Sequence, residues 1–234
     1  MLFRSGHNNL EVVATKRLPL REPAPIDVSP IGRKSLPGDT VGLARYLLGK
    51  IVVREIGQRI LTGRIVETEA YLEADPACHA FRGMTARNRS LFLKPGHAYV
   101  YLCYGTSYML NVSSEAAGIG AGVLLRALEP LSGLEHMRRA RKIETLRDLA
   151  RGPGRLAAAL GVDLRHDGVD LCRRGSLWIG DDGAGIGAIA ESVRIGLTKG
   201  AEARLRFFTA GNGFLSGPRS LNVPAPRRAA GTKA

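Results

Sequence analysis

The pattern of apolar and polar residues is clearest in the first third of the chain. Residues 51–56 and 60–71 are rich in the apolar and β-branched residues of β-strands, and a short polar turn joins them. Just before these strands, residues 41–48 place apolar side chains at helical spacing, with Asp39 or Thr40 as the N-cap. The pattern predicts a helix followed by two paired strands.

The rest of the chain consists of shorter elements separated by glycine-rich turns. The predicted elements are a hairpin of strands at 98–104 and 108–113, a strand at 122–128, helices between 132 and 160, and short strands at 177–180, 193–197 and 205–209. Ser132 and Glu135 form a capping-box pattern at the start of the helical region. Residues 72–97 show no strand period, and such a long loop inside a domain is usually functional.

These elements predict an α+β fold, with one domain built around an antiparallel or mixed sheet. The two ends of the chain differ in composition from the middle. Residues 1–36 have four prolines between Pro19 and Pro30, and residues 218–234 are rich in proline, alanine and basic residues. We expect a flexible N-terminal arm at 1–36, the folded domain at 37–217 and a flexible basic tail at 218–234.

The composition indicates a polyanionic partner. The 234 residues include 34 Lys and Arg against 21 Asp and Glu, a net charge of +13, and 44% of them are hydrophobic, which is enough for a sizeable core. Nucleic acid is the first candidate partner and an anionic membrane surface is the second. No run approaches the roughly 20 apolar residues of a membrane span, and polar residues interrupt the N-terminus where a signal peptide needs an apolar core.

The cysteines are three in number, Cys78, Cys103 and Cys172, and no two of them form a C-x-x-C pair. An odd, widely spaced set argues against a disulfide scaffold and against a cysteine zinc site. It suits a reducing cytoplasm. We therefore expect no metal.

A carboxylate and an aromatic ring stand two residues apart on the strand at 60–71. In a regular strand Ile65, Glu67, Glu69 and Tyr71 share one face. An ionisable carboxylate beside a flat ring is a plausible way to activate water next to a stacked planar substrate. Taken alone, however, the pattern is more typical of a half-exposed strand whose glutamates face water.

Arg126 lies inside the apolar run at 123–128 and needs an anionic partner if its guanidinium is buried. A pair with Glu69 would keep that carboxylate ionised and fix its orientation. A pair with a structural carboxylate such as Glu129 explains this feature equally well.

The tyrosines of the predicted hairpin suggest a binding surface. Tyr99 and Tyr101 share a face, and such pairs are usually cross-strand or core contacts. Tyr104, in contrast, precedes Gly105 at the turn, where a large ring would project from the tip. In a basic protein, such a ring is a candidate wedge for opening a step between bases.

The loop before the hairpin is basic. Arg87, Arg89 and Lys94 are candidate phosphate contacts or, alternatively, an ordinary solvated surface. His79 lies in the same loop without Cys or His partners at ligand spacing, so a hydrogen bond to a ligand is a better hypothesis than metal binding. Asn111 stands alone among apolar residues on the return strand and needs a partner if buried.

Taken in order, these segments resemble the alkyladenine DNA glycosylase family, the 3-methyladenine glycosylases that also remove hypoxanthine and related damaged purines. The resemblance is carried by R-I-V-E-T-E-A-Y-L at 64–72, His79, T-A-R-N-R-S-L-F at 85–92, K-P-G-H-A-Y-V-Y-L-C-Y-G at 94–105, N-V-S-S at 111–114 and V-L-L-R-A-L-E-P-L at 123–131. Weaker similarity continues at 152–156 and 193–208. The resemblance implies a curved sheet with surrounding helices and a protruding β-hairpin, like the C-terminal domain of a formyltransferase.

The resemblance also implies catalytic roles. Glu69 is expected to be the general base that activates the attacking water. Arg126 and the backbone carbonyl near Ile195 are expected to hold that water. Glu67, on the same face, acquires no partner in this comparison, and we interpret it as structural.

Further roles concern the damaged base and the DNA. Tyr71, His79 and Tyr101 are expected to be walls of the base pocket, with His79 also donating a hydrogen bond. Asn111 corresponds to the residue that penalises the exocyclic amino group of undamaged guanine. Tyr104 corresponds to the hairpin residue that is inserted through the minor groove of the DNA.

The implied function is base-excision repair. The enzyme would flip 3-methyladenine, 7-methylguanine, hypoxanthine or ethenoadenine out of duplex DNA and hydrolyse the N-glycosidic bond, leaving an abasic site. Because no lysine occupies the pocket motifs, we expect a monofunctional hydrolase without a Schiff base. The expected partner is double-stranded DNA, with no cofactor and no membrane, and the enzyme is expected to be a monomer in the cytoplasm of a bacterium, near the nucleoid, or in the nucleus otherwise.

Two other classes of function remain as alternatives. A damage-recognising protein without activity would predict a broken catalytic set, but Glu69 and Arg126 are both present. A formyltransferase-like or RNA-binding module is compatible with a similar sheet, since a fold alone does not decide function. That module has no use for a carboxylate, a tyrosine wall and a hairpin wedge together.

Overall fold

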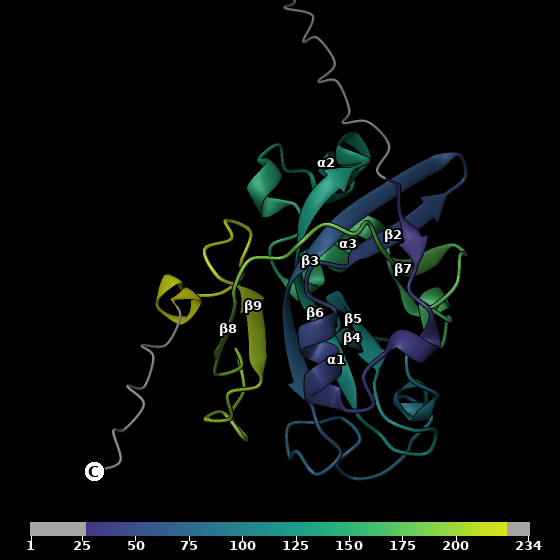
Figure 1. Cartoon of the computed structure of the whole chain (residues 1–234), viewed down its shortest axis with the longest axis vertical. Helices are drawn as coiled ribbons and strands as arrows, with labels where there is room; N and C mark the ends of the chain where they lie inside the picture. The colour runs from purple at the N-terminus through teal and green to yellow at the C-terminus, as the bar shows by residue number, and fades with distance from the viewer. Residues whose placement is uncertain (1–26, 224–234) are drawn as a thin grey trace, which may run out of the picture.

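A long central strand, β3 (Arg59–Tyr71), organises the sheet in the computed structural model, which describes residues 27–223 (Figure 1). One edge of β3 pairs with β6 (Gly122–Ser132). On its other edge, the first half pairs with β2 (Ile51–Ile56), and residues 67–69 pair with β9 (Arg206–Thr209). The C-terminal half of β3 is therefore enclosed by neighbouring strands on both edges.

The remaining strands extend the sheet on both sides of this centre. β5 (Ser107–Ser113) and then β4 (Ala98–Cys103) follow β6, β7 (Leu177–Asp181) and then β1 (Ser29–Pro30) follow β2, and β8 (Ile189–Ser192) pairs with β9. Every strand pairing in the described part of the chain is antiparallel. The expectation of an α+β fold around a curved antiparallel sheet is confirmed.

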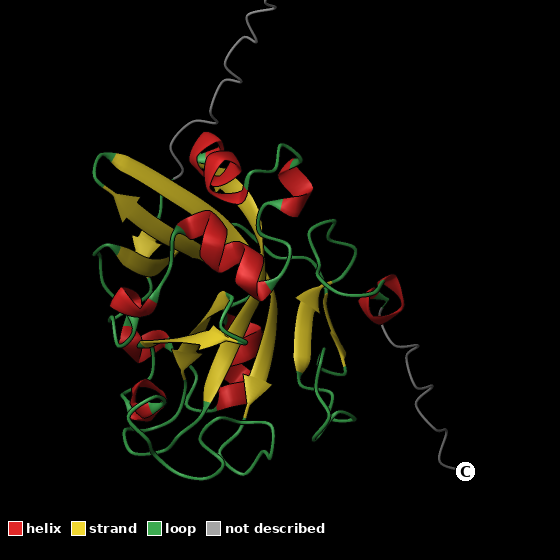
Figure 2. Cartoon of the chain, turned by 180° about the vertical axis from the view of Figure 1, so that it is seen from behind, coloured by secondary structure: helices red, strands yellow, loops and turns green. Residues whose placement is uncertain are grey.

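Helices cover the sheet, as Figure 2 shows from behind. α1 (Thr40–Tyr46) begins as expected, because the side chain of its N-cap Asp39 accepts a hydrogen bond from the Gly42 amide. α1 lies against β3, where the Thr68 hydroxyl donates to the Ala44 carbonyl. α2 (Leu134–Arg141) and α3 (Pro153–Leu160) follow β6, and short 3₁₀ turns occur at Arg33–Ser35, Arg89–Phe92, Leu146–Asp148, Leu164–His166 and Arg219–Asn222.

The main hydrophobic core joins α1, α3 and one face of the curved sheet. Leu43 from α1 and its C-cap Leu47, Leu156 and Leu160 from α3, and Ile65 from β3 are all fully buried in this cluster. Away from this core, β3 buries the carboxylates of Glu67 and Glu69, and its Val66 joins a smaller apolar cluster with Phe208 and Leu215. β3 thus carries buried polar groups as well as core residues.

A β-bulge changes the alternation that the sequence predicts along β3. The pairing with β6 shifts register between Ile65 and Glu67, and again between Glu67 and Thr68. Ile65 consequently belongs to the core beside α1, whereas Glu67 and Glu69 turn to the opposite face. The expectation that Ile65 shares a face with the two glutamates is therefore wrong.

Most predicted elements are present, and two predictions fail for identifiable reasons. Ser132 does not cap a helix, because it belongs to β6 and exchanges a hydrogen bond of 2.8 Å with Thr62; Gly133 is the N-cap instead. Residues 193–197 do not form a strand, since the chain leaves the sheet after β8. They form an irregular segment that returns to the end of β3, where Arg194 donates to the Ala70 carbonyl.

The domain boundaries also need correction where the structure describes them. Val28 and Ile31, expected in a flexible arm, are buried, and Ser29–Pro30 pairs with β7. At the other end, Arg206 donates to the Leu221 carbonyl and to the side chain of Asn222. Packing therefore starts before residue 37 and continues past residue 217, while the rest of both expected arms lies outside the described residues.

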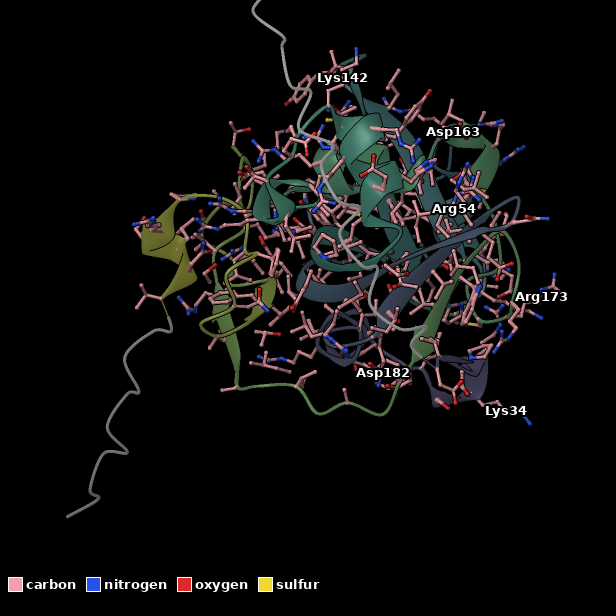
Figure 3. All side chains as sticks on the ribbon, turned by 90° about the horizontal axis from the view of Figure 1, so that it is seen from above. Lys34, Arg54, Lys142, Asp163, Arg173 and Asp182 are labelled. Carbon is pink, nitrogen blue, oxygen red and sulfur yellow. The ribbon has the colours of Figure 1, made fainter. Side chains whose placement is uncertain are left out.

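Charged side chains project from the ribbon on all sides, as the labelled Lys34, Lys142 and Arg173 illustrate in Figure 3. Within residues 27–223, no helix has the length and apolarity needed to cross a membrane.

Candidate active site

A cavity of about 340 Å³ opens where the C-terminal end of β3 meets the β4–β5 hairpin. Its walls come from segments far apart in the chain: the end of β3, the loop at 77–79, the hairpin strands, β6, the start of α3 and the irregular segment at 195–197. Every expected base-pocket residue lines it, together with Arg126, Tyr104 and Ile195. The structure thus brings the expected pocket residues together around one space.

Glu69 is fully buried directly behind this wall. Its Oε2 accepts hydrogen bonds from Nη1 of Arg126 at 3.0 Å and from the Tyr71 hydroxyl at 2.9 Å. Its Oε1 accepts one from the backbone amide of Ile195 at 2.8 Å. All three donors line the cavity, so the carboxylate lies one layer beneath its surface.

The expected ion pair between Arg126 and Glu69 is present, but Arg126 is shared. Its Nε donates to Glu67 at 2.9 Å, and its Nη2 donates to the Ser216 hydroxyl at 3.2 Å. Burial lowers the pKa of Arg126, but the two carboxylates outweigh that effect and raise it. The alternative partner Glu129 instead contacts Asn212.

The interpretation of Glu67 as a residue without a partner is wrong. Its Oε1 accepts from Arg126, from Nε of Arg206 at 2.7 Å and from the Ser216 hydroxyl at 2.7 Å, while Oε2 accepts from the Ser216 amide. Burial by itself raises the pKa of Glu67, but Arg126 and Arg206 reverse the effect and hold it below its usual value. The sequence reasoning missed this network because the bulge in β3 and the return of residues 206–216 create it.

Aromatic rings form another part of the cavity wall. Tyr99 and Tyr101 stack with centroids 5.3 Å apart, and His79 meets Tyr101 edge-on at 4.5 Å. Nδ1 of His79 lies 2.9 Å from the Tyr99 hydroxyl. Burial raises the pKa of both tyrosines, whereas burial and the nearby Arg87 lower the pKa of His79. His79 is therefore mostly neutral near pH 7.

Asn111 has the partner that a buried amide requires. Its Nδ2 donates to the Tyr99 carbonyl at 3.1 Å across the hairpin, and the side chain also lines the cavity. This bond uses one of the two Nδ2 hydrogens, and the second makes no hydrogen bond with the described residues.

Tyr104 is at the tip of the hairpin, and 95% of its surface is exposed. Both Tyr104 (φ 48°) and Gly105 (φ 70°) have positive φ, as the central residues of a type I′ turn do, and the Thr106 amide donates to the Cys103 carbonyl. The usual first residue of such a turn is Asn, Asp or Gly, because a bulky side chain is strained there. An exposed tyrosine in this position is not explained by the fold.

The three expected backbone contacts differ in their surroundings. Arg87 donates to the Leu102 carbonyl at 3.2 Å and lies 5.8 Å from the Tyr101 centroid, so it borders the aromatic wall. Arg89 and Lys94 are exposed.

Arg194 is a site residue that the sequence reasoning missed. Its guanidinium lies 4.6 Å from the centroid of the Tyr71 ring and pairs with the buried Asp75. The signal that singles out Arg126, a charged residue in an apolar run, is also present at Val193-Arg194-Ile195.

Among residues 27–223, no group of three or more His, Cys, Asp or Glu side chains is arranged to hold a metal ion. The cavity is lined by four tyrosines, by His79 and by the guanidinium of Arg126, and the carboxylate of Glu69 lies behind its wall.

Comparison with known proteins agrees with this arrangement. A model of the methylpurine-DNA glycosylase family matches residues 34–213. Proteins with the provisional name 3-methyladenine DNA glycosylase are similar over most of their length: one from Mesorhizobium japonicum is 64% identical over 83% of this chain and 94% of its own, and one from Paraburkholderia phytofirmans is 50% identical over 87% and 98%. A third, from Koribacter versatilis, is 47% identical over 83% and 96%. This chain belongs to the methylpurine-DNA glycosylase family and is a DNA glycosylase.

Proposed function

We propose that this DNA glycosylase excises alkylated and deaminated purines from duplex DNA with Glu69 as the general base. The candidate substrates are 3-methyladenine, 7-methylguanine, hypoxanthine and ethenoadenine. The observation that supports the proposal most is a buried carboxylate, held by three donors, directly behind an aromatic cavity of base size.

The described residues leave the carboxylate of Glu69 a free position at which it could accept a hydrogen bond from a water molecule. A carboxylate has about four lone-pair positions, and protein donors in the described residues use three of them, two on Oε2 and one on Oε1. The fourth position, on Oε1, lies beside the Ile195 amide. A water there would be near Arg126 and Ile195, as the family resemblance implies.

In the proposed reaction, the oxygen of this water attacks C1′ of the extruded nucleotide. The N-glycosidic bond breaks through an oxocarbenium-like state, and its electron pair leaves with the base. Glu69 accepts the proton from the water. Among residues 27–223, no lysine that could form a Schiff base at C1′ lines the cavity, and we therefore assign a monofunctional hydrolysis.

The cavity walls fit a planar base. Tyr71, the stacked pair Tyr99 and Tyr101, and His79 all line it, and we assign to Tyr71 the face on which the base stacks. Cationic or electron-poor purines stack on electron-rich rings more strongly than normal bases do. A guanine amino group, in contrast, would meet the remaining Nδ2 hydrogen of Asn111, donor against donor.

Access to the cavity requires that the nucleotide leave the duplex, which costs about a few kcal/mol. We assign to Tyr104 the role of filling the vacated stack, because its ring is exposed at the hairpin tip and borders the cavity. Arg87, Arg89 and Lys94 would contact the phosphates on the same side. The enzyme would act as a monomer on double-stranded DNA, without a cofactor, in the cytoplasm beside the bacterial chromosome.

A product assay tests this proposal. Duplexes that contain one hypoxanthine, ethenoadenine or 3-methyladenine are incubated with enzyme in excess. We expect release of the free base and an abasic strand that breaks only after alkali treatment. Strand breakage without alkali would contradict the monofunctional mechanism, and the absence of abasic sites on all three duplexes would contradict the proposed substrate class.

A further inference from the structure

A buried guanidinium lies over the ring of Tyr71 and outside the lining of the cavity. The Cζ of Arg194 is 4.6 Å from the ring centroid, and the Arg194 side chain is 0% exposed. Tyr71 lines the cavity and Arg194 does not. A base stacked on Tyr71 would therefore be separated from this cation by the thickness of one ring.

Four polar contacts hold Arg194 in this position. Nη1 donates to the Ala70 carbonyl at 2.9 Å and pairs with Oδ2 of Asp75, while Nη2 donates to Oδ1 of Asp75 at 3.1 Å and to the Gly200 carbonyl at 3.3 Å. The planar fork of arginine allows these bonds and the stacking contact at once, which lysine could not match. The geometry keeps the charge of Arg194 at a fixed distance from Tyr71.

The Asp75 side chain is only 5% exposed, so the ion pair is buried on both sides. Replacing a buried ion pair by apolar residues is often neutral or stabilising, so stability alone is a weak reason for its presence. The position of the pair suggests another reason. The negative face of an aromatic ring attracts cations, and a cation already bound on one face weakens the attraction that the other face offers to a second cation.

We propose that the Asp75–Arg194 pair sets the selectivity of this enzyme between cationic and neutral damaged purines. Arg194 makes the cavity face of Tyr71 less attractive to a cationic base, and Asp75 offsets this effect. The two charges act through Tyr71, so both residues are positioning residues rather than catalytic ones. The inference rests on the proposed function, since it assumes that the excised base stacks on Tyr71.

The experiment breaks the same ion pair from its two ends. Single-turnover excision rates are measured on duplexes with 7-methylguanine, which has a fixed positive charge, and with hypoxanthine, which is neutral. In Arg194→Met the ratio of the cationic to the neutral rate is expected to rise about three- to tenfold, because the competing cation is gone. In Asp75→Asn this ratio is expected to fall by a similar factor, because no carboxylate then offsets the positive charge of Arg194.

A purely structural role predicts a different result, since both variants lose the same contact and would lower both rates together. A ratio that is unchanged, or that moves in the same direction in both variants, would overturn the proposal. If a single variant fails to fold, the double variant Arg194→Met/Asp75→Asn removes both buried charges. Its ratio is expected within about twofold of wild type and above that of Asp75→Asn, and a ratio equal to that of Asp75→Asn would overturn the proposal.

A matched control exists on α1. Arg45 lies 4.4 Å from the Phe207 centroid and pairs with Glu191 at 2.6 Å, and none of these three residues lines the cavity. Arg45→Met and Glu191→Gln are expected to leave the ratio unchanged. If wild type excises neither lesion, the proposed function fails; if it excises both and the ratio does not respond, only this inference fails.

Discussion

At the scale of residues, the site depends on two carboxylates with different surroundings. Glu69 accepts hydrogen bonds from three groups of the cavity wall, whereas Glu67 is enclosed by Arg126, Arg206 and Ser216. Arg126 connects the two, because its Nε bonds one carboxylate and its Nη1 bonds the other. Glu67 thus fixes the orientation of the guanidinium that faces Glu69.

The first prediction concerns this network. Glu67→Gln keeps the shape of the side chain but leaves Arg206 without a buried counter-charge, so the free energy of unfolding is expected to fall by about 3 kcal/mol. Urea unfolding of wild type and variant measures the change. Glu129→Gln, on the neighbouring strand, serves as the control and is expected to change stability little, because the side chain of Glu129 is half-buried and its one hydrogen bond among residues 27–223 is a long one to Asn212. A loss below about 1 kcal/mol in Glu67→Gln would contradict the role assigned to this network.

The sequence predicted part of this arrangement. The pair of Arg126 with Glu69 follows from a charged residue in an apolar run that needs a partner. The second partner, Glu67, could not be predicted, because two register shifts in β3 decide which way its side chain points. Arg194 shows the same signal as Arg126, but only the irregular path after β8 brings it behind Tyr71.

At the scale of elements, the β4–β5 hairpin shows a conflict between fold and function. Its strands occupy nearly the predicted ranges, and the turn has the positive φ angles that favour Asn-Gly. A tyrosine takes the first position at a conformational cost. Such strain at an exposed position is typical of a functional residue.

The second prediction tests this conflict. Tyr104→Asn is expected to stabilise the protein slightly, by up to about 1 kcal/mol, because Asn tolerates the left-handed conformation. The same variant is expected to slow excision from a duplex severalfold and to affect excision from a single strand much less, since no stack must be filled there. Melting temperature and single-turnover rates measure the two effects. Equal slowing on both substrates would argue against the wedge.

The apolar runs of the sequence predicted most strands of this sheet well, because the central strands β2, β3 and β6 are buried along most of their length. The segment at 193–197 was predicted as a strand from its apolar residues, yet it bends away from the sheet. Its amide at Ile195 bonds Glu69, and its side chains line the cavity. These apolar residues line the cavity instead of packing within a sheet. The local sequence pattern is the same in both cases, so it does not distinguish them.

At the scale of the whole molecule, the charge of +13 favours any polyanion. Many of the basic residues already form ion pairs with carboxylates of this chain, such as Arg64 with Asp182 and Lys50 with Asp181. Arg89, in the loop before the hairpin, is exposed. Exposed basic residues such as Arg89 are therefore expected to contribute more to DNA binding than those in ion pairs.

The third prediction measures this difference. Log K for duplex DNA is expected to fall linearly with log salt, and Arg89→Gln is expected to reduce the slope by about one. Arg59→Gln is the matched control, because Arg59 is exposed at the far end of β3, about 40 Å along the strand from Tyr71. The same change of slope in both variants would contradict the prediction, because it would show that basic residues contribute to DNA binding regardless of their position on the protein.

The fourth prediction concerns stability against pH. The pKa values of His79 and His166 are lowered from 6.5, mainly by burial, so the unfolded chain binds more protons as the pH falls below that value. Glu67, lowered from 4.5, acts in the same sense below its own ordinary pKa. Stability is therefore expected to be greatest above pH 6.5 and to decline in two stages on acidification. Urea midpoints at pH 7.5, 5.5 and 4.0 measure it, and a higher midpoint at pH 5.5 than at 7.5 would contradict the prediction.

The central claim is that Glu69 acts as the base, and the most direct test separates excision from binding. Wild type and Glu69→Gln are compared on the same hypoxanthine duplex, with single-turnover excision and affinity measured side by side. The account predicts an affinity within a few-fold of wild type, because Tyr104, the aromatic wall and the basic loop are unchanged. It predicts excision slower by at least about a hundredfold, because no carboxylate accepts the proton of the water. Excision at the wild-type rate by Glu69→Gln would contradict it.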